Sequence, residues 1–593
     1  MKSRISCCNG PLLKKDLFRG IPLWGAYLLC WLVALPLLIL SEGRWRSGGG
    51  LQIYVLELAV HAAHPVAFCY GLVTACLVFS WQFKSRSANF FGALPLRRET
   101  QFLTHYLAGL LYALIPHALA ALLTVPAGWY HGTGLGLEAL TWLASMTIAY
   151  VFYYSFAVLL AQIVGNLTAL PPLYLVLNFT VVVVEAIVTA LLQCFVYGIP
   201  SRGELTLGWA SPLYYALAES PLRMETVWRG EEVYGGIFHG WGHLGVLAAV
   251  GAAFTVIAFL LHKYRRMESA GDVIAIRHLK PVFLYCFTVG CSLVLGIALS
   301  SILSSGLTTG NFVPAVLCML SGAVIGYFLG EMMLHRSIRV FRKRNILNCA
   351  VCCGVILAAM LCLRFDLTGY SAYVPERAEI KAVGLGTSRC WSEDPELIDR
   401  VQSLHQDCVD QQREVEQMMG RNVWMPEFIL RYELTDGRIV YREFGMPVTE
   451  ETSVDPDSLI RQWEEIVNHP EYITLRLLPK DIRATDIAYC SITDNFGGQV
   501  FLTSDETYTL LQTALLPDLK ETTLGNEYYT DTYRTDVNQT YLNIWIEIGI
   551  VEGQTAPGQK VQDITRYYTA NITADAMRVA KFLSAYDLQP SRE

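Results

Sequence analysis

The chain has 593 residues, of which 53% are hydrophobic and only 16% are charged, and its mean hydropathy is +0.35. This balance is too apolar for an ordinary soluble enzyme of this length and predicts a membrane protein. The charge is unevenly divided, because residues 1–363 carry 24 Lys or Arg against 14 Asp or Glu, whereas residues 364–593 carry 21 against 38. We therefore expect the two parts to lie in different environments.

Nine apolar runs of membrane-spanning length follow one another in the first part. The first run comes after a basic start and is interpreted as a retained helix preceded by a short amphipathic segment, not as a cleaved signal peptide. The expected limits are 21–40, 59–80, 104–125, 141–160, 171–196, 241–261, 281–301, 312–333 and 346–363. The sequence thus predicts a polytopic α-helical membrane protein of about nine spans.

The connections between these runs differ in basic charge. With the N-terminus inside, the inner connections carry 19 Lys or Arg and the outer ones carry 5. Basic residues near helix ends remain on the cytoplasmic side, so this bias predicts a cell-membrane protein with a cytoplasmic N-terminus. An odd number of spans then places residues 364–593 outside the cell.

This C-terminal part has the sequence pattern of a soluble α+β domain. The stretch "FILRYELTDGRIVYREF" predicts two strands around Asp436-Gly437, and helices with polar caps are expected in "DPELIDRVQSLHQ" and "DPDSLIRQWEEIV". A second, weaker copy of the pattern follows, in which "VYREFGMPVT" matches "ITRYYTANIT" and places Arg442 over Arg566. We interpret this as a possible tandem β-α-β-β-α duplication, the alternative being chance similarity between amphipathic elements.

The sequence lacks several catalytic motifs. It contains no Gly-Lys dipeptide and hence no phosphate-binding P-loop, and neither HExxH nor GxSxG occurs. We expect no enzymatic activity, no metal, no cofactor and no nucleic-acid binding. Cys390 and Cys408 could form a disulfide outside the cell, but the odd number of three cysteines in this part favours no framework.

Polar residues inside the fifth expected span are candidates for function. Glu185 lies near its middle, where a carboxylate costs about 2.5–3.5 kcal/mol on insertion scales. Asn178 and Thr189 fall on the same helix stripe. This stripe could line a substrate path or bond across a dimer interface, or a protonated Glu185 could simply hold two helices together.

The eighth expected span carries a repeat of small residues. Gly322, Gly326 and Gly330 recur every four residues and leave one helix face bare. Such spacing favours close contact with a neighbouring helix.

The connection after the second expected span contains "FFGALPLRRET", residues 90–100. Pro95 should end one helix so that another can begin at the double arginine. On composition alone this is an ordinary basic inner loop that contacts lipid headgroups, although a short rigid element of this kind also suits docking of a protein.

Beyond its composition, the stretch "NFFGALPLRRETQFLTHYLAGLLY" resembles the segment after the second span in permease subunits of type-2 ABC exporters. Three further stretches, "YRRMESAGDVIAI", "GEMMLHRSIRVFRKR" and "RFDLTGYSAYVPE", resemble a bacterial branch that has added spans and a C-terminal extracytoplasmic domain of unknown role. The resemblance covers most of residues 80–380. It implies a six-span core in residues 1–262, three further helices in 263–363, and the outer domain in 364–593.

The resemblance also implies roles for particular residues. The segment that couples the membrane subunit to its ATPase would comprise Leu94, Pro95, Arg97, Arg98 and Glu99, and a second element on the inner face would contain Glu268, Gly271 and Asp272. The expected partners are a separate ABC ATPase, a second copy or a related permease, and the lipid bilayer. The transported substrate is left open.

Two other functions are compatible with the residues. The chain could be an ATPase-independent receptor whose outer domain binds a peptide or cell-wall ligand. It could also be a proton-coupled carrier working through Glu185, but it lacks the internal inverted halves expected of many such carriers.

Overall fold

A computed structural model of the chain describes most of its length. The described residues are 8–42, 48–201, 206–229, 232–265, 268, 270–303, 312–386, 390–419, 423–477, 483–494, 498–524, 526–533, 541–551 and 565–586. They divide into two compact units. Unit 1 falls within 1–189, 204–299 and 316–357, and unit 2 within 190–203, 300–315 and 358–593.

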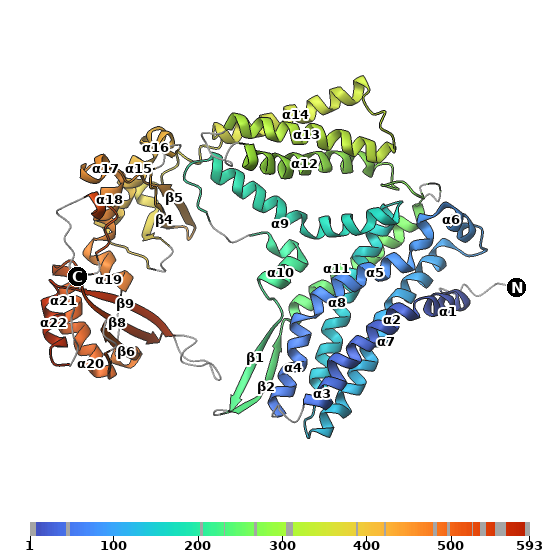
Figure 1. Cartoon of the computed structure of the whole chain (residues 1–593), viewed down its shortest axis with the longest axis horizontal. Helices are drawn as coiled ribbons and strands as arrows, with labels where there is room; N and C mark the ends of the chain where they lie inside the picture. The colour runs from blue at the N-terminus through green and yellow to red at the C-terminus, as the bar shows by residue number, and fades with distance from the viewer. Residues whose placement is uncertain are drawn as a thin grey trace. The chain divides into compact units, whose positions relative to one another are not determined.

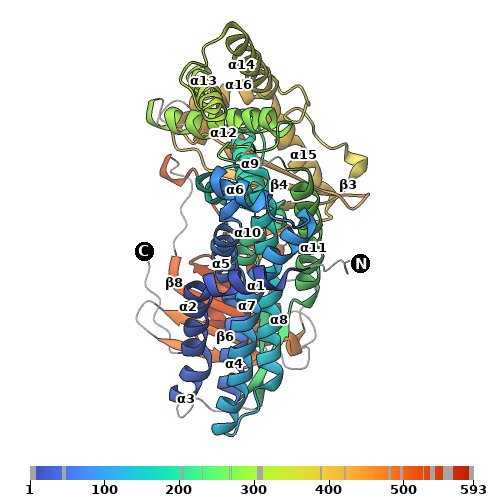
Figure 2. The same cartoon turned by 90° about the vertical axis from the view of Figure 1, so that its right-hand side faces the viewer.

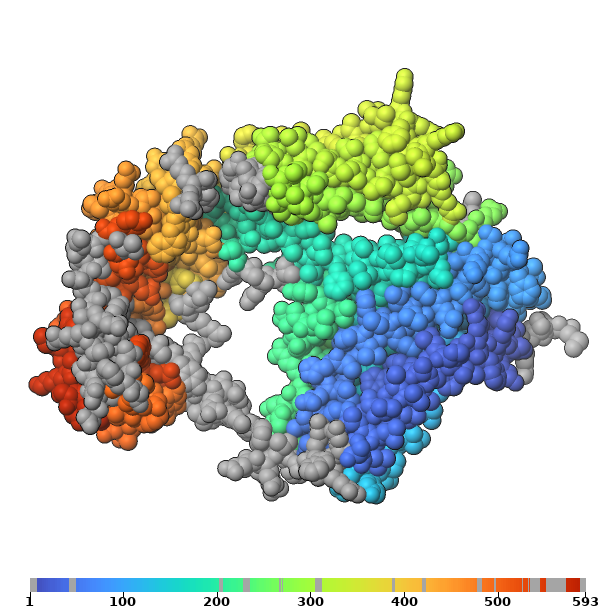
Figure 3. Space-filling model, in the orientation of Figure 1, coloured from blue at the N-terminus to red at the C-terminus, as the bar shows by residue number. Residues whose placement is uncertain are grey.

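Unit 1 is built from helices packed around one central helix. Helix α8 contacts α4, α5, α7 and α11, and Figures 1 and 2 show these helices running beside one another. In the space-filling view the helices from α1 to α8 form a continuous packed surface (Figure 3). The bounds are α1 Gly10–Arg19, α2 Ile21–Leu32, α3 Leu38–Glu42, α4 Gly48–His61, α5 Ala63–Val78, α6 Ser85–Gly92, α7 Arg98–Tyr130, α8 Gly136–Ile163, α9 Leu170–Phe195, α10 Pro212–Ala218, α11 Trp241–Tyr264, α12 Leu279–Leu303, α13 Phe312–His335 and α14 Lys343–Arg364.

Many of these helices are long and apolar enough to cross a membrane. Among the described residues eight single helices qualify, and the bent pair α4–α5 would make a ninth. Each of the nine expected spans coincides with one of these candidates, so the prediction of a polytopic helical protein agrees with the structure. Within the best apolar window, 67% of α8 is buried but only 17% of the α9 candidate and 11% of α14, so most of the α9 and α14 side chains are not buried within the protein.

The second candidate differs from its expected limits of 59–80. The helix starts at Gly48, ends at His61 and resumes at Ala63, with a bend of 50° between the two halves. Pro65 lies in the first turn of α5. Because it has no N–H to donate to a carbonyl of the preceding turn, the helix is interrupted just before it. In the first span Pro36 likewise lies within a π-helical turn, Val33–Leu37.

The connection between α9 and α11 contains regular secondary structure of its own. It contains α10 and then a hairpin of β1, Arg223–Arg229, and β2, Glu232–His239. The hairpin packs against α4. Trp209, just before α10, and Trp241, the first residue of α11, are both exposed. Exposed tryptophans of this kind are typical of a membrane interface.

Unit 2 contains two lobes, each with an antiparallel sheet (Figure 1). The first lobe has the strand order β3-β4-β5 and a core in which α15 and α18 pack on one face of the sheet. As predicted, Gly437 has a positive φ of 84° in the β4–β5 turn, and the Asp394 side chain caps α15 by accepting from the Leu397 N–H. The bounds are β3 Ile380–Leu385, α15 Pro395–Asp410, α16 Gln412–Met419, β4 Glu427–Leu434, β5 Ile439–Gly445, α17 Glu450–Val454, α18 Leu459–Val467 and α19 Pro470–Leu477.

The second lobe repeats this strand order with one addition. Its sheet runs β7-β6-β8-β9, so β6, β8 and β9 correspond to β3, β4 and β5, and β7 is extra. The first strand pair has an irregularity at the same place in both lobes, between Ile380 and Ala382 and between Ile487 and Tyr489. The bounds are β6 Ile487–Asp494, β7 Gln499–Leu502, α20 Ser504–Leu510, α21 Leu516–Glu521, β8 Tyr541–Val551, β9 Thr565–Thr573 and α22 Met577–Leu583.

The strand register corrects the residue-by-residue match between the two lobes. Arg442 pairs with Leu430, whereas Ala570 pairs with Ile546. At the irregularity that the two lobes share, Ile380 pairs with Leu434 and Ile487 pairs with Ile550. Leu430 and Ile546 each lie four residues before these partners, so they are equivalent. Arg442 therefore corresponds to Ala570, and the predicted match with Arg566 is wrong by four residues.

The cysteines of the C-terminal part are not joined. Neither Cys390 nor Cys408 is part of a disulfide. The Cys390 Sγ donates to the carbonyl of Leu475 at 2.8 Å, and the Cys408 side chain is fully buried in the first lobe.

Candidate functional site: the surface formed by α6 and the start of α7

Helix α6, the turn after it and the first turn of α7 form one short basic surface, which we call the α6–α7 surface. Helix α6 ends at Gly92, and the chain becomes helical again only at Arg98, after an extended Arg97 with φ −68° and ψ 145°. Pro95 causes this interruption, because its ring disfavours a helical conformation at Leu94 and it has no N–H to donate. The predicted helix stop and restart are confirmed.

The side chains on this surface suit the docking of a partner. Lys84, Arg86, Pro95 and Arg97 are exposed, and Phe90 is 59% exposed. Residues 84–97 contain no Asp or Glu to neutralise these cations. A positive surface with an exposed aromatic ring favours an acidic partner surface with an apolar recess.

The expected coupling residues separate into two groups. Leu94, Pro95 and Arg97 lie in the turn, but Arg98 and Glu99 have partners within the chain. Arg98 Nη1 donates to the carbonyls of Lys263 at 3.2 Å and Arg265 at 2.9 Å. Glu99 forms an ion pair with Lys263 at 3.6 Å. These contacts join the first turn of α7 to the last turn of α11, where carbonyls have no helical partner and favour a cation.

The far side of α6 is anchored by aromatic and polar contacts. The ring of Trp81, in the 3₁₀ turn Ser80–Phe83, lies 4.8 Å from that of Phe91 and 5.3 Å from that of His105. His105 Nδ1 lies 2.6 Å from Asp16 Oδ2 in α1, and both side chains are buried. The α6–α7 surface therefore rests on a packed base.

Sequence reasoning missed Asp16 and His105. A signal was present, because Asp16 lies four residues after the buried Leu12 and thus on the apolar stripe of α1. A carboxylate on a buried stripe requires a hydrogen-bonding partner. His105 could have been identified only from the packing of α1 on α7.

The second predicted element lies beside the connection between α8 and α9. Ile274 pairs with Val164, and the Ala275 N–H donates to the carbonyl of Ile163 at 2.8 Å. Gly271 has a φ of 99°, which favours glycine over residues with a side chain. This segment is held to the loop that precedes α9.

Asp272 and Glu268 of the same element differ in their surroundings. The Asp272 carboxylate pairs with Lys280 at 3.0 Å and with Arg336 at 3.9 Å. These two cations come from the start of α12 and the end of α13, so Asp272 holds these two helix ends together. Glu268 is exposed.

Glu185 binds a loop of its own chain. Its Oε1 accepts from the Thr206 N–H at 2.6 Å and from Thr206 Oγ1 at 2.7 Å, and the Leu207 N–H donates to both carboxylate oxygens at 3.0 Å. Asn178 is buried and donates to the carbonyl of Tyr174 one turn earlier, and Thr189 is half-buried. The three residues therefore do not share one partner among the described contacts.

The glycines of α13 face α12. An added Cβ at Gly326 would lie 2.4 Å from the Cys291 Cβ, and one at Gly322 would lie 2.9 Å from the Cys291 carbonyl oxygen. At Gly330 it would meet the Leu284 side chain at 2.8 Å. This is the close helix contact that the four-residue spacing predicts.

Comparison with known proteins adds no relative to this description. The chain matches no protein-family model, no curated protein and no solved structure.

Proposed function

We propose that this chain is the membrane subunit of an ABC transporter and that the α6–α7 surface receives a separate ATPase subunit. The basic charge of the predicted inner connections, the absence of a P-loop in the chain and the resemblance of residues 80–380 to exporter permeases support this proposal. The observation that carries it is the exposed surface of Phe90, Pro95 and Arg97, which has no acidic residue and lies at the start of the longest helix. Export of an unidentified substrate is the proposed direction.

The contacts around this surface suggest how a partner's movement would reach the membrane helices. Helix α7 continues from the turn for 33 residues, with Pro116 and Pro126 inside it, so a displacement of its first turn would be passed to the turns that follow. Arg98 and Glu99 connect the same turn to the end of α11. Closure of the ATPase would then move α7 and α11 together against α8, a rigid-body change of the kind common in switching proteins.

Co-expression of the chain with its cognate ATPase tests this proposal. Phe90→Ala and Arg97→Glu should each reduce co-purification of the ATPase at least tenfold, whereas Arg339→Glu, a reversal at another exposed basic residue of a predicted inner connection, should not. Unchanged co-purification with both surface variants would reject the coupling role.

The predicted orientation requires its own measurement. An impermeant thiol reagent added to intact cells should label Glu465→Cys in the C-terminal domain and should not label Arg86→Cys on α6. Both side chains are exposed in the structure, so accessibility within the fold is matched. Labelling of Arg86→Cys from outside would place the α6–α7 surface on the wrong side for an ATPase.

A receptor function is the second candidate, favoured by contacts in unit 2. The Glu443 N–H on the edge strand β5 donates to the carbonyl of Gly198, just after α9, and the Ser201 hydroxyl donates to the Glu443 carboxylate at 2.7 Å. The first lobe is therefore bonded to the end of a candidate membrane span. A protein that relays the binding of an external ligand would use such a connection, and transport activity that persists when the lobe's ligand is absent would argue against it.

We further propose that the two lobes arose by tandem duplication. Their common strand order and the irregularity at the same place in the first strand pair support this origin. Strand β7 would then be an addition to the second copy.

A further inference from the structure

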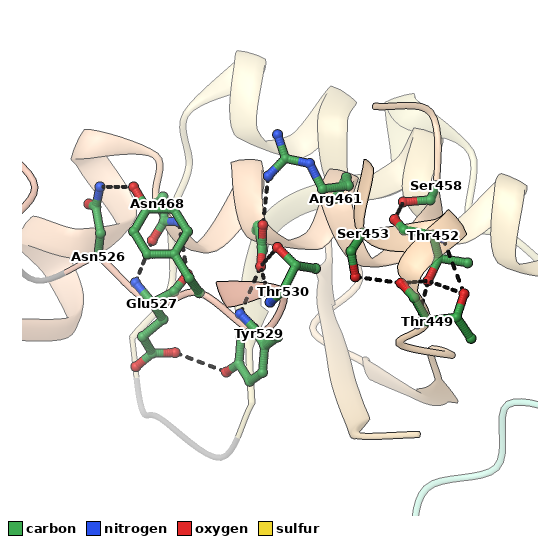
Figure 4. Close-up of polar contacts among 12 residues, drawn as sticks. Thr449, Thr452, Ser453, Ser458, Arg461, Asn468, Asn526, Glu527, Tyr529 and Thr530 are labelled. Atoms are coloured by element: carbon green, nitrogen blue, oxygen red, sulfur yellow. Dashed lines mark hydrogen bonds and ion pairs between the residues drawn. The ribbon is translucent and has the colours of Figure 1, made fainter. Parts of the chain in front are cut away.

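A short segment between α21 and β8 in the chain, Glu527–Thr530, lies against α18 of the first lobe (Figure 4). Asn468, at the end of α18, binds both backbone groups of Glu527: its Nδ2 donates to the carbonyl at 2.9 Å, and its Oδ1 accepts from the N–H at 2.7 Å. One amide side chain thus satisfies a complete backbone unit of a segment far away in sequence.

Glu464 continues this recognition one turn earlier in α18. Its Oε1 accepts from the N–H groups of Tyr529 at 2.7 Å and Thr530 at 2.9 Å and from the Thr530 hydroxyl at 2.8 Å. Its other oxygen accepts from Arg461 at 2.7 Å, and the residue is 1% exposed (Figure 4). A buried carboxylate requires such donors; Arg461 supplies one from α18 itself, and the segment supplies three.

The side chains of the segment also make specific contacts. The Tyr529 ring lies 4.9 Å from that of Phe428 in an edge-on contact and packs against the core of the first lobe. The Glu527 carboxylate pairs with Arg476 of α19 and accepts from the Tyr529 hydroxyl at 3.0 Å. The contacts with the first lobe therefore specify an acidic residue, an aromatic residue two positions later and then a hydroxyl residue, whereas the Tyr528 hydroxyl between them accepts from Asn526 of the same segment at 3.0 Å.

We propose that the first lobe is a peptide-binding module and that Glu527–Thr530 occupies its site as a tethered ligand. Backbone groups held by side chains, together with an aromatic pocket and an arginine for a carboxylate, are the features by which domains bind short peptides. The ligand class is a peptide with the order acidic residue, any residue, aromatic residue, Thr or Ser. This inference concerns the C-terminal domain alone and does not depend on the proposed transport function.

The tether determines when another peptide can bind. An intramolecular occupant competes at an effective concentration in the millimolar range. A peptide in solution reaches the site only when it is abundant at the surface of the protein or when the tethered segment is displaced. The site is accordingly expected to be closed in the isolated chain.

The experiment uses the full chain with residues 526–530 replaced by Gly-Ser-Gly-Ser-Gly and a fluorescent peptide, Asn-Glu-Tyr-Tyr-Thr-Asp, taken from residues 526–531. Fluorescence anisotropy should show saturable binding to this variant, and the unaltered chain should need at least about 100-fold more peptide because of the competing tether. A peptide with Ala in place of the acidic, aromatic and hydroxyl residues should not bind.

Two neighbouring glutamates provide a matched control. In the replaced chain, Glu464→Gln should weaken peptide binding at least about tenfold, since the bonds to Tyr529, to Thr530 and to Arg461 lose their charge assistance. Glu465→Gln, whose side chain is 56% exposed, should leave binding unchanged. Equal effects of the two substitutions would contradict the proposed site.

A second variant covers the case in which the replaced chain does not fold. Tyr529→Ala keeps the backbone contacts of the segment, empties the aromatic pocket and removes the hydroxyl bond to Glu527, so it should bind the peptide more tightly than the unaltered chain. The absence of saturable binding both in a folded replacement variant and in Tyr529→Ala would overturn the proposal and leave the segment as a structural connection only.

Discussion

Arg98 Nη1 lies 2.9 Å from the carbonyl oxygen of Arg265, so the first turn of α7 is hydrogen-bonded to the end of α11. Arg98→Ala removes this bond and the one to Lys263. Bonds from charged donors contribute about 1.5–3 kcal/mol when buried, but Arg98 is exposed, and we expect a loss of about 1 kcal/mol in the free energy of unfolding. Thermal unfolding of the purified protein measures it, and Arg97→Ala on the exposed turn should change the Tm little. A larger effect at Arg97 would show that the turn, not the α7–α11 contact, supports the fold.

Glu185→Ala should release the loop at Thr206. The carboxylate is the acceptor for both the Thr206 and the Leu207 N–H groups, so these two amides lose their partner. Hydrogen exchange at the two residues should become at least about tenfold faster, because exchange reports local opening. Glu138→Ala, at the start of α8, is the control and should leave these two amides protected. Unchanged exchange in Glu185→Ala would mean that the loop is held by other contacts.

Gly326→Ala should weaken the packing of α12 on α13. The new Cβ would lie 2.4 Å from the Cys291 Cβ, so the helices must separate, at a cost of about 1–3 kcal/mol in the free energy of unfolding. Gly354→Ala on α14 is the matched control, since a Cβ there meets nothing within 4 Å and alanine favours the helix. Thermal unfolding of both variants compares them directly. If Gly326→Ala and Gly354→Ala had the same Tm, α12 and α13 could separate without loss of stability.

The stability of the first lobe should depend on pH through Glu427 in β4. Although much of its side chain is exposed, desolvation of its carboxyl group and then the charge of nearby Glu443 raise the pKa of Glu427. A group with a raised pKa in the folded state stabilises the fold below its unfolded pKa of about 4.5, and this contribution is lost as the pH rises through the folded value. We therefore expect Glu427→Gln, which resembles the protonated form, to raise the Tm at pH 7 and to have little effect near pH 4. An increase in Tm of the same size at pH 4 and at pH 7 would show that the raised pKa of Glu427 is not the cause.

Much of the fold could be predicted because it depends on short-range patterns. Runs of apolar residues identified all nine candidate spans, and Pro95, Asp394 and Gly437 predicted a helix stop, a helix cap and a hairpin turn. In each case the residue acts on its immediate neighbours along the chain. The division of residues 1–363 into six core and three added spans remains a prediction.

The residue contacts of the candidate site could not be predicted in the same way. Arg98 was expected to touch a partner protein, and only the arrangement of α7 beside α11 shows that it reaches carbonyls 165 and 167 residues away in sequence. Glu185 was expected to face a path or a second helix, whereas its partners come from an irregular loop. The match of Arg442 with Arg566 failed because sequence similarity carries no information about strand register, which the pairing of neighbouring strands determines.

Helix α9 is uninterrupted from Leu170 to Phe195, and the residues that follow it are bonded through Gly198 and Ser201 to the edge of the first lobe's sheet. Within unit 2 the last turns of α9 and the edge of β5 are therefore neighbours, although 242 residues separate Ser201 from Glu443 in sequence. A helix that ends in this way carries its own attachment point for the folded domain that follows much later in the chain.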